Sequence, residues 1–566
     1  MRLGLFPGFY NLHKKSMKFG PLFFQDTISV NNAPNTSVAI LLVTHNSSRV
    51  IKDCLESLVK SQYDNVNLYI WDNYSEDWDI TRHCISKVEN LINTKISRSN
   101  CNIGFGPAIN RLSKIISDEK YLFFINPDGQ LDKYTLQNLV SFAELSYKEG
   151  FRVWEARQLP FEHPKFYNPV TLETDWFSGA CVLLDHEAFK ETGGFDENIF
   201  LYGEDVDLSW KLRSKGYKIC YVPWATFLHN SYEYPYQVKE NQHFYSAESN
   251  IYLRWKYGNI LDILKGYILI FLRLFRKKTF ENYRSRFLKH VKTGTFKGLK
   301  KLLDRDKVNK TCPATFIGAH YEVRREGAFL KAAHSSDKNP LVSVIIRTVG
   351  RPAILRATLQ SILNQTYPNI EIIVAEDGDR TAESLLDSLS GLGKRVVYYA
   401  SEKKIGRSNI GNKGLELSTG EFINFLDDDD YFFADHIEVL ANALIDNPSA
   451  SAAYSLGFEL HCRLKSIDPY QYDCIRMGHR YNIKFDRKKL KLSNYIPINT
   501  VMFRRRLYEE HGGFDEKSEL LEDWDLLLRY SLDNEFIFIP KTTCIYLINL
   551  DTSSKRQKIL DAAKIT

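Results

Sequence analysis

The second half of the chain repeats the pattern of strands and helices found in the first. An apolar run of strand length ends at Thr44, and a second such run ends at Thr348. A helical stretch and a further apolar run follow each of them, ending at Asp72 and at Glu376. The offset from position 44 to 348 equals the offset from 72 to 376. A period this long indicates tandem domains rather than a solenoid of short repeats.

Each copy begins with a strand, a helix and a strand in that order. In the first copy, a helical pattern from Arg49 to Lys60 separates the runs VAILLV and NLYIW. In the second copy, a pattern from Pro352 to Asn364 separates LVSVII and EIIVA. We therefore predict α/β domains with a doubly wound, mixed sheet whose ligands bind at the carboxyl ends of the strands.

Two acidic landmarks follow in both copies. The run YLFFI leads into Asn126-Pro127-Asp128, and Asp427-Asp428-Asp429 follows at nearly the same offset. Further on, the pair Glu204-Asp205 precedes the pair Glu522-Asp523 at a slightly larger offset. Four landmarks in the same order at nearly constant spacing indicate an internal duplication rather than chance.

The stretch from Phe425 to Phe432, FLDDDDYF, ends an apolar run with four consecutive aspartates. Adjacent carboxylates repel one another unless a cation holds them. Oxygen ligands of this kind suit Mg²⁺ or Mn²⁺, which commonly share their remaining positions with substrate phosphates. Taken alone, the run is more typical of a solvated acidic turn. Its position at a predicted strand end, within a repeated pattern, favours a metal-bridged diphosphate.

With these motifs, both halves resemble the nucleotide-sugar-dependent glycosyltransferases of family 2, which have the GT-A fold. The likeness covers roughly residues 36–258 and 338–550. It implies that an acidic residue ending the second strand contacts the nucleobase or ribose. It also implies that a DxD-type motif binds the metal ion and the diphosphate, and that the Asp of a Glu-Asp pair is the catalytic base.

Carried over position by position, the resemblance gives roles to residues of both halves. The catalytic bases it implies are Asp205 and Asp523. The metal ligands it implies are Asp128, His229 and Asp429. The donor-binding residues are Thr44, Asp72, Asn102, Gly104, Asn126, Thr348, Glu376, Asp377, Arg407 and Asp427. The acceptor-side residues are Trp176, Gly179, Glu204, Asn499, Thr500, Glu522 and Trp524.

Glycosyl transfer from a nucleotide sugar needs these residue types. Negative charge builds on the leaving diphosphate, and a divalent cation, Mg²⁺ or Mn²⁺, disperses it as a Lewis acid. The attacking sugar hydroxyl loses a proton, which a positioned carboxylate can accept. One displacement of this kind inverts the anomeric centre. The alternative for Asp205 and Asp523 is that they only cap helices, as acids at helix starts commonly do.

The two halves differ in ways that bear on the metal and the donor. Asn126-Pro127-Asp128 offers one carboxylate, so we expect weaker metal binding there than at the four aspartates. The first half resembles rhamnosyltransferase-like members of the family, for example at residues 102–106 and 176–180, which implies dTDP-rhamnose as its donor. In the second half, Asn549 stands where the family often has a His. A UDP-sugar or another nucleotide sugar is expected there.

The spacing of the cysteines and the length of the apolar runs bear on the cellular compartment of the protein. The nine cysteines are scattered, without CxxC or metal-ligand spacing, which is typical of a reducing environment. No charged-then-apolar signal pattern opens the chain. No uninterrupted apolar run reaches about eighteen residues, the length of a spanning helix. We therefore expect a cytoplasmic protein.

A basic segment separates the halves. From Arg254 to Lys307 there are sixteen Lys or Arg and four acids, whereas the whole chain carries +6. Within it, the apolar stretch Ile260 to Phe275, followed by Arg276-Lys277-Lys278, is typical of a helix lying on an anionic membrane. A helix buried between the domains is the alternative. Nucleic acid is not expected, because no stacking aromatics or recognition helix accompany the charge.

These observations predict an N-terminal extension over residues 1–35, GT-A domains over 36–258 and 338–566, and a basic amphipathic helical linker over 259–337. The expected protein is a bifunctional inverting glycosyltransferase, peripheral on the inner face of the cytoplasmic membrane. It would add successive sugars to a lipid-linked glycan such as O-antigen or capsule. Two alternatives remain: one domain is catalytic and the other positions the acceptor, or the chain is a non-catalytic scaffold that binds carbohydrate or nucleotide.

Overall fold

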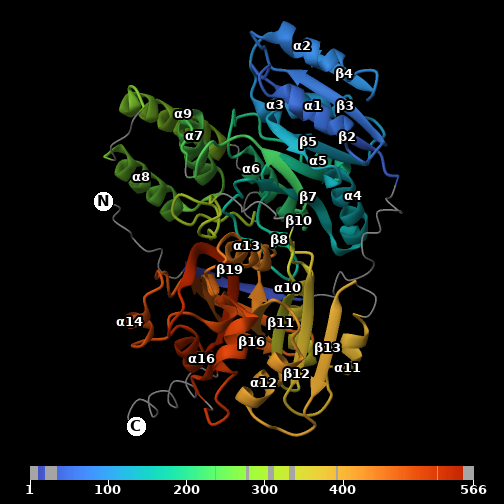
Figure 1. Ribbon diagram of the computed structural model, residues 1–566. Helices are drawn as coiled ribbons and strands as arrows, with labels where there is room; N and C mark the ends of the chain where they lie inside the picture. Colours follow the sequence, from blue (N-terminus) through green and yellow to red (C-terminus); the bar gives the residue numbers. More distant parts are fainter. Residues whose placement is uncertain are drawn as a thin grey trace.

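The computed structural model of the chain consists of two α/β domains and a group of helices beside the first (Figure 1). It describes residues 10–19, 35–235, 237–275, 280–303, 312–330, 338–389, 393–518 and 520–551. The first domain runs from blue to green and the second from yellow to red. The duplication expected from the sequence is therefore a duplication of domains.

The sheet of the first domain has the strand order β4-β3-β2-β5-β9-β7-β10-β6. Strands β2 to β5 are parallel to one another, and β9 runs antiparallel between β5 and β7. The strands are β2 (Val38–Thr44), β3 (Val66–Asp72), β4 (Thr94–Arg98), β5 (Tyr121–Ile125), β6 (Gly129–Leu131), β7 (Phe151–Leu159), β8 (Glu173–Thr174), β9 (Cys181–Asp185) and β10 (Lys218–His229). The mixed sheet matches the predicted fold class.

Helices cover both faces of this sheet because its central strands are apolar on both sides. Every residue of β5 is buried. The helices of the domain are α1 (Ile51–Val59), α2 (Trp78–Ser86), α3 (Phe105–Ser113), α4 (Thr135–Ser146), α5 (His186–Glu191) and α6 (Glu204–Ser214). Parallel strands covered in this way leave their carboxyl ends free for a ligand.

The second domain repeats the same central order, β13-β12-β11-β14-β18. Its strands are β11 (Val342–Thr348), β12 (Ile370–Glu376), β13 (Arg395–Ala400), β14 (Phe422–Asp427), β15 (Tyr431–Phe432), β16 (Ala452–Ser466), β17 (Gln471–Gly478), β18 (Val501–Arg504) and β19 (Phe536–Asn549). Its helices are α10 (Pro352–Leu363), α11 (Glu383–Asp387), α12 (Arg407–Leu417), α13 (His436–Asp446), α14 (Arg487–Leu490), α15 (Arg505–His511) and α16 (Glu522–Tyr530).

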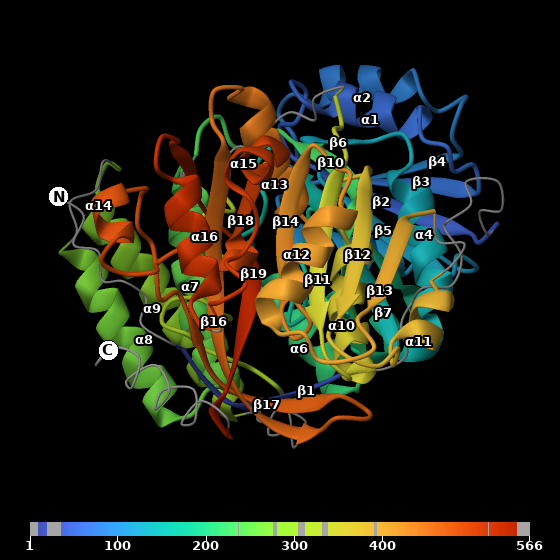
Figure 2. The ribbon, with the colours of Figure 1, turned by 60° about the horizontal axis from the view of Figure 1, so that its bottom comes forward.

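The N-terminal extension contributes a strand to the second domain. Strand β1 (Tyr10–Lys18) pairs antiparallel with β17, at the edge of that sheet, as Figure 2 shows. Phe19 then packs against Tyr431 and stacks on Tyr470. No periodicity in the extension predicted this strand, which ties the start of the chain to a sheet of the distant second domain.

The segment between the domains has two parts. Helices α7 (Glu240–Tyr257), α8 (Ile260–Leu274) and α9 (Tyr283–Leu303) share an apolar cluster beside the first domain. Residues 312–330 then pass to the second domain, where Arg325 contacts Asp435. The predicted basic residues 276–278, and the linker residues 304–311 and 331–337, lie outside the described residues. Of the helices described, none is both long and apolar enough to cross a membrane.

Buried charges join the two domains. Arg325 lies 2.7 Å from Asp435, and Lys541 lies 2.6 Å from the other oxygen of that carboxylate. Lys541 also lies 3.1 Å from Glu162 of the first domain. Although burial opposes ionisation, Arg325 and Lys541 hold the pKa of Asp435 below its usual range. The cluster fixes the first domain, the linker and the second domain to one another.

Candidate active sites

At the strand ends of the first domain, Asp72 is fully buried next to Thr44 on the neighbouring strand. One oxygen of its carboxylate accepts from Arg98 Nε at 2.8 Å and from the Ser75 backbone at 3.2 Å. The loop before α3 is held by Asn73, whose side-chain oxygen accepts from the Ile103 backbone at 2.9 Å. Protein contacts alone therefore hold Asp72 and this loop in place.

At Gly104 this loop packs closely against the backbone of Phe200. The φ of 90° at Gly104 lies in the region that favours glycine, and a Cβ there would lie 2.5 Å from the Phe200 carbonyl oxygen. The Gly104 amide donates to the Asn102 side chain at 3.0 Å. The Asn102 side chain therefore helps to hold the backbone of this loop in its conformation.

The metal position expected in the first domain joins two strands. Asp128 follows β5, and His229 ends β10 with its Nε2 3.2 Å from Asp128 Oδ1. Gln158 donates to Ser178 Oγ at 3.2 Å, which leaves its carbonyl oxygen to accept from His229 Nδ1 at 3.1 Å. His229 Nε2 is buried, and beside this carboxylate it has no further hydrogen-bond partner among the described residues.

These atoms fit a divalent cation. An imidazole nitrogen and a carboxylate oxygen this close together are both common ligands of divalent cations, and Gln158 contacts the other ring nitrogen as the outer partner of a ligating His does. Across the described residues there is no cluster of three or more His, Cys, Asp or Glu with metal-binding geometry. The protein would therefore supply two ligands, Asp128 and His229, and leave the other positions to the diphosphate and water.

The Glu-Asp pair of the first domain opens α6. Asp205 accepts from the Val206 backbone at 2.8 Å and from the Gly179 backbone at 3.4 Å. Burial raises the pKa of Asp205 to about 6. Burial and the charge of Asp205 raise the pKa of Glu204 to about 8. At neutral pH Asp205 is therefore the ionised member of the pair, and a carboxylate with a raised pKa is a better general base.

A cavity of about 700 Å³ brings these groups together. Its wall includes Asn126, Trp176, His229, Glu204 and Asp205. His229, which contacts Asp128, and the Glu-Asp pair come from distant segments and border one chamber, whereas Asp72 is not part of its wall. Its volume lies within the range of small-ligand sites in proteins.

The raised pKa predicts a pH dependence for the first site. We expect the rate of any reaction in which Asp205 accepts a proton to rise with pH through an inflection near 6, because Asp205 must be ionised to do so. The kcat/KM profile of a chain carrying Asp523→Asn isolates this site. Because Asp205 ionises before Glu204, Glu204→Gln should keep this inflection. A profile that is flat between about pH 5 and 7 would contradict the assignment.

In the second domain, arginines join the strand ends to the Glu-Asp pair. Arg347, in β11, lies 2.8 Å from Asp427 and 3.1 Å from Glu522. Arg407, at the start of α12, contacts the same two carboxylates. The predicted donor-binding residues Arg407 and Asp427 are thus partners of each other. Glu522, predicted on the acceptor side, is buried beneath them.

The four consecutive aspartates point in different directions. Asp428 is buried and accepts from Thr348 Oγ1 at 2.6 Å and from Arg351. Asp430 accepts from Asn499 at 3.0 Å. Asp429 is more open, with 37% of its side chain exposed, and lies 3.6 Å from Arg351. As arranged, these carboxylates are held by protein groups and do not form a metal site.

The expectation of tighter metal binding in the second half stays a prediction. That expectation counted carboxylates, but three of the four are engaged by Arg347, Arg351, Arg407 or Asn499. The first half has one carboxylate, and His229 lies beside it as a second possible ligand. The neighbours of a carboxylate, rather than the number of carboxylates, decide its availability to a cation.

Glu376 and Asp377 both hold nearby backbone segments in place through hydrogen bonds. Glu376 is buried and accepts from the Gly350 and Ala382 backbones at 3.2 and 3.1 Å. Asp377 accepts from the Ile405 backbone at 2.7 Å. This is the contact that Asn73 makes in the first domain, so the two loops before α3 and α12 are anchored in the same way.

The candidate base of the second domain is Asp523. It accepts from the Trp524 backbone at 2.9 Å and from Asn494 at 3.2 Å, and burial raises its pKa. The indole N–H of Trp524 donates to the Leu490 carbonyl at 2.7 Å. Thr500 donates to the Pro497 carbonyl at 2.7 Å, so its hydroxyl satisfies a turn.

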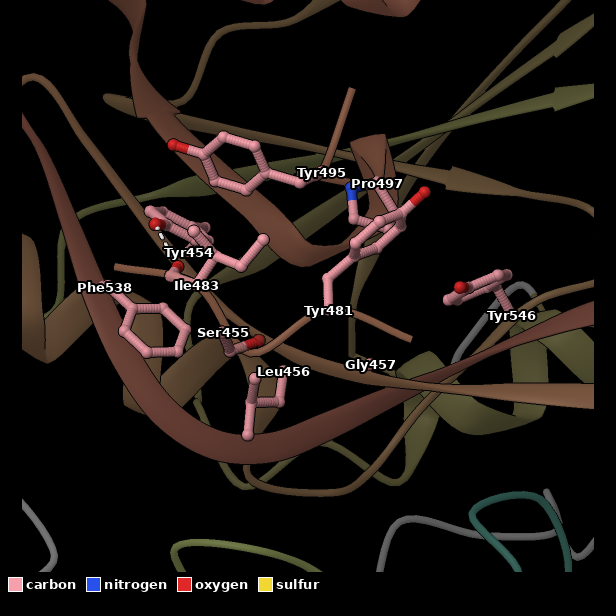
Figure 3. Close-up of a pocket in the computed structure, with 10 residues that line it drawn as sticks. All are labelled: Tyr454, Ser455, Leu456, Gly457, Tyr481, Ile483, Tyr495, Pro497, Phe538 and Tyr546. Carbon is pink, nitrogen blue, oxygen red and sulfur yellow. Dashed lines mark hydrogen bonds between the residues drawn. The ribbon is translucent and has the colours of Figure 1, made fainter. Parts of the chain in front are cut away.

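The second domain also contains a small pocket lined by aromatic side chains. Figure 3 shows Tyr454, Tyr481 and Tyr495 around it, with Tyr546 at one side. Its volume is about 10 Å³, which is room for a single water molecule. In this conformation the pocket does not admit a sugar ring.

Some residues of the sites carried no signal in the sequence. Arg347 and Arg351 follow an apolar run like many surface arginines, and only the fold brings them to the aspartates. Gln158 becomes relevant through its contact with His229. Lys165 lies in the wall of the cavity, pairs with Glu155 and donates to the Trp176 carbonyl at 2.9 Å. Burial lowers its pKa to about 7.

The repeated sheet order, with acids at the strand ends and a Glu-Asp pair at a helix start, agrees with the GT-A fold expected from the sequence. The model of glycosyl transferase family 2 matches residues 39–189 and 343–512, more than half of the chain. The chain therefore belongs to glycosyltransferase family 2 and carries two copies of the family domain.

Curated relatives are similar over part of the chain. An uncharacterized glycosyltransferase of Bacillus subtilis, YwdF, is 28% identical over 228 residues, which is 39% of this chain and 81% of that protein. Glycosyltransferase GlyA of Streptococcus pneumoniae is 27% identical over 38% of this chain and 31% of its own length. Chondroitin synthase of Pasteurella multocida is 27% identical over 38% of this chain and 21% of its own length.

Solved structures are similar to about half of the chain. Residues 1–349 of S. aureus TarS align with 15% identity and a TM-score of 0.33, covering 49% of this chain and 90% of that one. The mannosyltransferase PcManGT of Pyrobaculum calidifontis, in complex with GDP-Man and Mn²⁺, aligns with 13% identity and a TM-score of 0.33, covering 50% and 92%.

Proposed function

We propose that both domains transfer sugars, in succession, to a lipid-linked glycan of a cell-surface polysaccharide such as O-antigen or capsule. The observation that supports this most is that each half brings its Glu-Asp pair near a strand-end acid, through His229 beside Asp128 in the first half and through Arg347 between Asp427 and Glu522 in the second. Relatives named for chondroitin and hyaluronan synthesis support a polysaccharide product. For the first domain we propose dTDP-rhamnose as donor, and for the second a UDP-sugar or another nucleotide sugar.

In this proposal each domain inverts the anomeric centre in one displacement. Asp205 takes the proton from the acceptor hydroxyl in the first domain, and Asp523 does so in the second. Gly179 and Trp524 hold these carboxylates through backbone N–H groups. Arg347 and Arg407 would turn from Asp427 to the donor diphosphate when it binds, since guanidinium groups bind phosphate oxygens well.

We propose a divalent cation, Mg²⁺ or Mn²⁺, for the first domain, held by Asp128 and His229. When bound, it supplies Lewis acid stabilisation of the leaving diphosphate. Gln158→Leu should weaken Mn²⁺ binding by about 10–100-fold, because the His229 ring loses the partner that orients it. Mn²⁺ titration followed by electron paramagnetic resonance measures this directly. Gln130→Leu, whose side chain faces Asp53, is the control.

A thermal-shift assay on the full chain tests the proposed donors. A nucleotide that binds the native state raises the melting temperature by mass action. dTDP and UDP should each raise it, and together they should raise it further if they occupy different domains. Arg98→Ala, which removes the partner of Asp72, should reduce the dTDP effect alone. No shift with any nucleoside diphosphate would contradict the proposal.

A second candidate is that only the first domain transfers sugar and the second positions the acceptor. The arginine contacts of Asp427 and Asp428 in the second domain favour it. A chain carrying Asp205→Asn distinguishes the two. Continued transfer from any nucleotide sugar supports two active domains, and complete loss supports one.

We also propose peripheral attachment to the inner face of the cytoplasmic membrane through residues 260–307. The alternative from the sequence is a helix buried between the domains. Helix α8 instead keeps large apolar side chains exposed, with Ile260 at 76% and Ile268 at 59%.

A further inference from the structure

Helix α8 has two apolar faces, and one of them is uncovered. Its outer face consists of Ile260, Leu261, Leu264, Ile268, Phe271 and Leu272, each between 54% and 76% exposed. Their spacing places them on one side of the helix. Single exposed apolar residues are ordinary, but a contiguous stripe of this size marks a surface that meets another apolar phase.

The opposite face of α8 borders the first active site. Gly266, Leu269, Ile270 and Arg273 line the same cavity as Asp205. Ile270 also packs in the apolar cluster shared by α7, α8 and α9. One helix therefore separates the uncovered stripe from the catalytic chamber, and a helix with its side chains is about 10 Å thick.

The neighbouring helix carries only positive charge. From Tyr283 to Leu303, α9 contains no acid, and its exposed residues include Arg284, Lys289 and Lys292 beside Leu288 and Phe296. Figures 1 and 2 show α8 and α9 together at one flank of the molecule. Exposed apolar side chains interleaved with Lys and Arg are the pattern of helices that lie in the interface of an anionic bilayer.

We propose that the outer face of α8 lies in an anionic membrane surface and that α8 forms the wall between the bilayer and the first active site. This rests on the proposed function, because an acceptor attached to a lipid must present its glycan close to the membrane. The first domain then receives acceptors whose glycan begins at the lipid headgroup. The second domain is joined to the linker through the buried cluster at Asp435.

Vesicle co-sedimentation of the full chain tests the docking. The chain should bind vesicles of phosphatidylcholine mixed with phosphatidylglycerol, and bind them less well as salt rises. The double variant Ile268→Glu/Phe271→Glu should lose at least about tenfold in binding, because it puts charge into the apolar interface. The matched control is Ile80→Glu/Leu492→Glu, which changes two residues that are 60% and 83% exposed elsewhere.

Two further measurements locate the contact. Hydrogen exchange should slow in residues 260–274 when anionic vesicles are added, and a photoreactive phosphatidylglycerol should cross-link to α8. Equal vesicle binding by the double variant and the wild type would overturn the proposal. The proposal would also be overturned if the chain did not bind vesicles and instead self-associated through α8 in analytical ultracentrifugation. Vesicle binding needs no catalysis, so loss of all sugar transfer with docking intact would overturn the proposed function alone.

Discussion

Asp205→Asn should abolish one of two sugar transfers and leave the other intact, and Asp523→Asn should do the reverse. Each substitution keeps the size of the side chain but removes its ability to accept a proton. The loss in kcat should be about 10²–10⁴-fold, the usual contribution of a general base. The two transfers are measured separately, with the full chain and one nucleotide sugar at a time.

The geometry makes the two effects independent. Asp205 lies at the start of α6 and Asp523 at the start of α16, in separate domains with separate sheets. Asp525→Asn is a suitable control, because Asp525 lies on α16 but pairs with Arg529 at 2.9 Å. If either variant kept both activities, the assignment of the bases would be refuted. If either variant lost both, the two sites would not be separate.

Asp435→Asn should destabilise the junction between the domains by about 3–5 kcal/mol, the usual effect of removing one partner from a buried ion pair. The change leaves Arg325 and Lys541 buried with too little negative charge, since each of their side chains is at most 5% exposed. The free energy of unfolding in urea, followed by tryptophan fluorescence, measures the effect.

Two comparisons make this result specific. Asp446→Asn changes an exposed Asp at the other end of α13, so it should alter the free energy of unfolding by less than about 0.5 kcal/mol. The double variant Asp435→Asn/Lys541→Met should be less destabilised than the sum of the single changes, because it removes a charge of each sign. A strictly additive double variant would mean that Asp435 and Lys541 are not energetically coupled.

The sequence predicted the elements whose signals are local. Apolar runs ending at Thr44, Asp72, Thr348 and Glu376 became strands β2, β3, β11 and β12, which end at these residues. Buried parallel strands are apolar on both faces, and the short length of these runs and the helical patterns between them favour strands, whose final acids then lie at one sheet edge. The constant offset between these runs then predicted two domains of one fold, which the family match confirms.

Features that depend on contacts between distant segments could not be predicted. Strand β1 pairs with β17 although the two strands lie far apart in the sequence. Apolar and polar residues alternate only weakly along β1, so its sequence did not indicate a strand. The contact of Arg347 with Asp427 and Glu522 requires three elements to meet. The open face of α8 could not be distinguished from a buried one, because both faces of the helix are apolar and only packing decides which is covered.

Each domain is expected to bind a nucleoside diphosphate beside its own acids. Crystals of the full chain grown with Mn²⁺, dTDP and UDP test this most directly. We expect one diphosphate next to Asp128 and His229, with an anomalous manganese peak between these side chains. A second should contact Arg347 and Arg407, near Asp523. Diphosphate density in only one domain, or away from these residues, would contradict the proposal of two nucleotide-sugar sites.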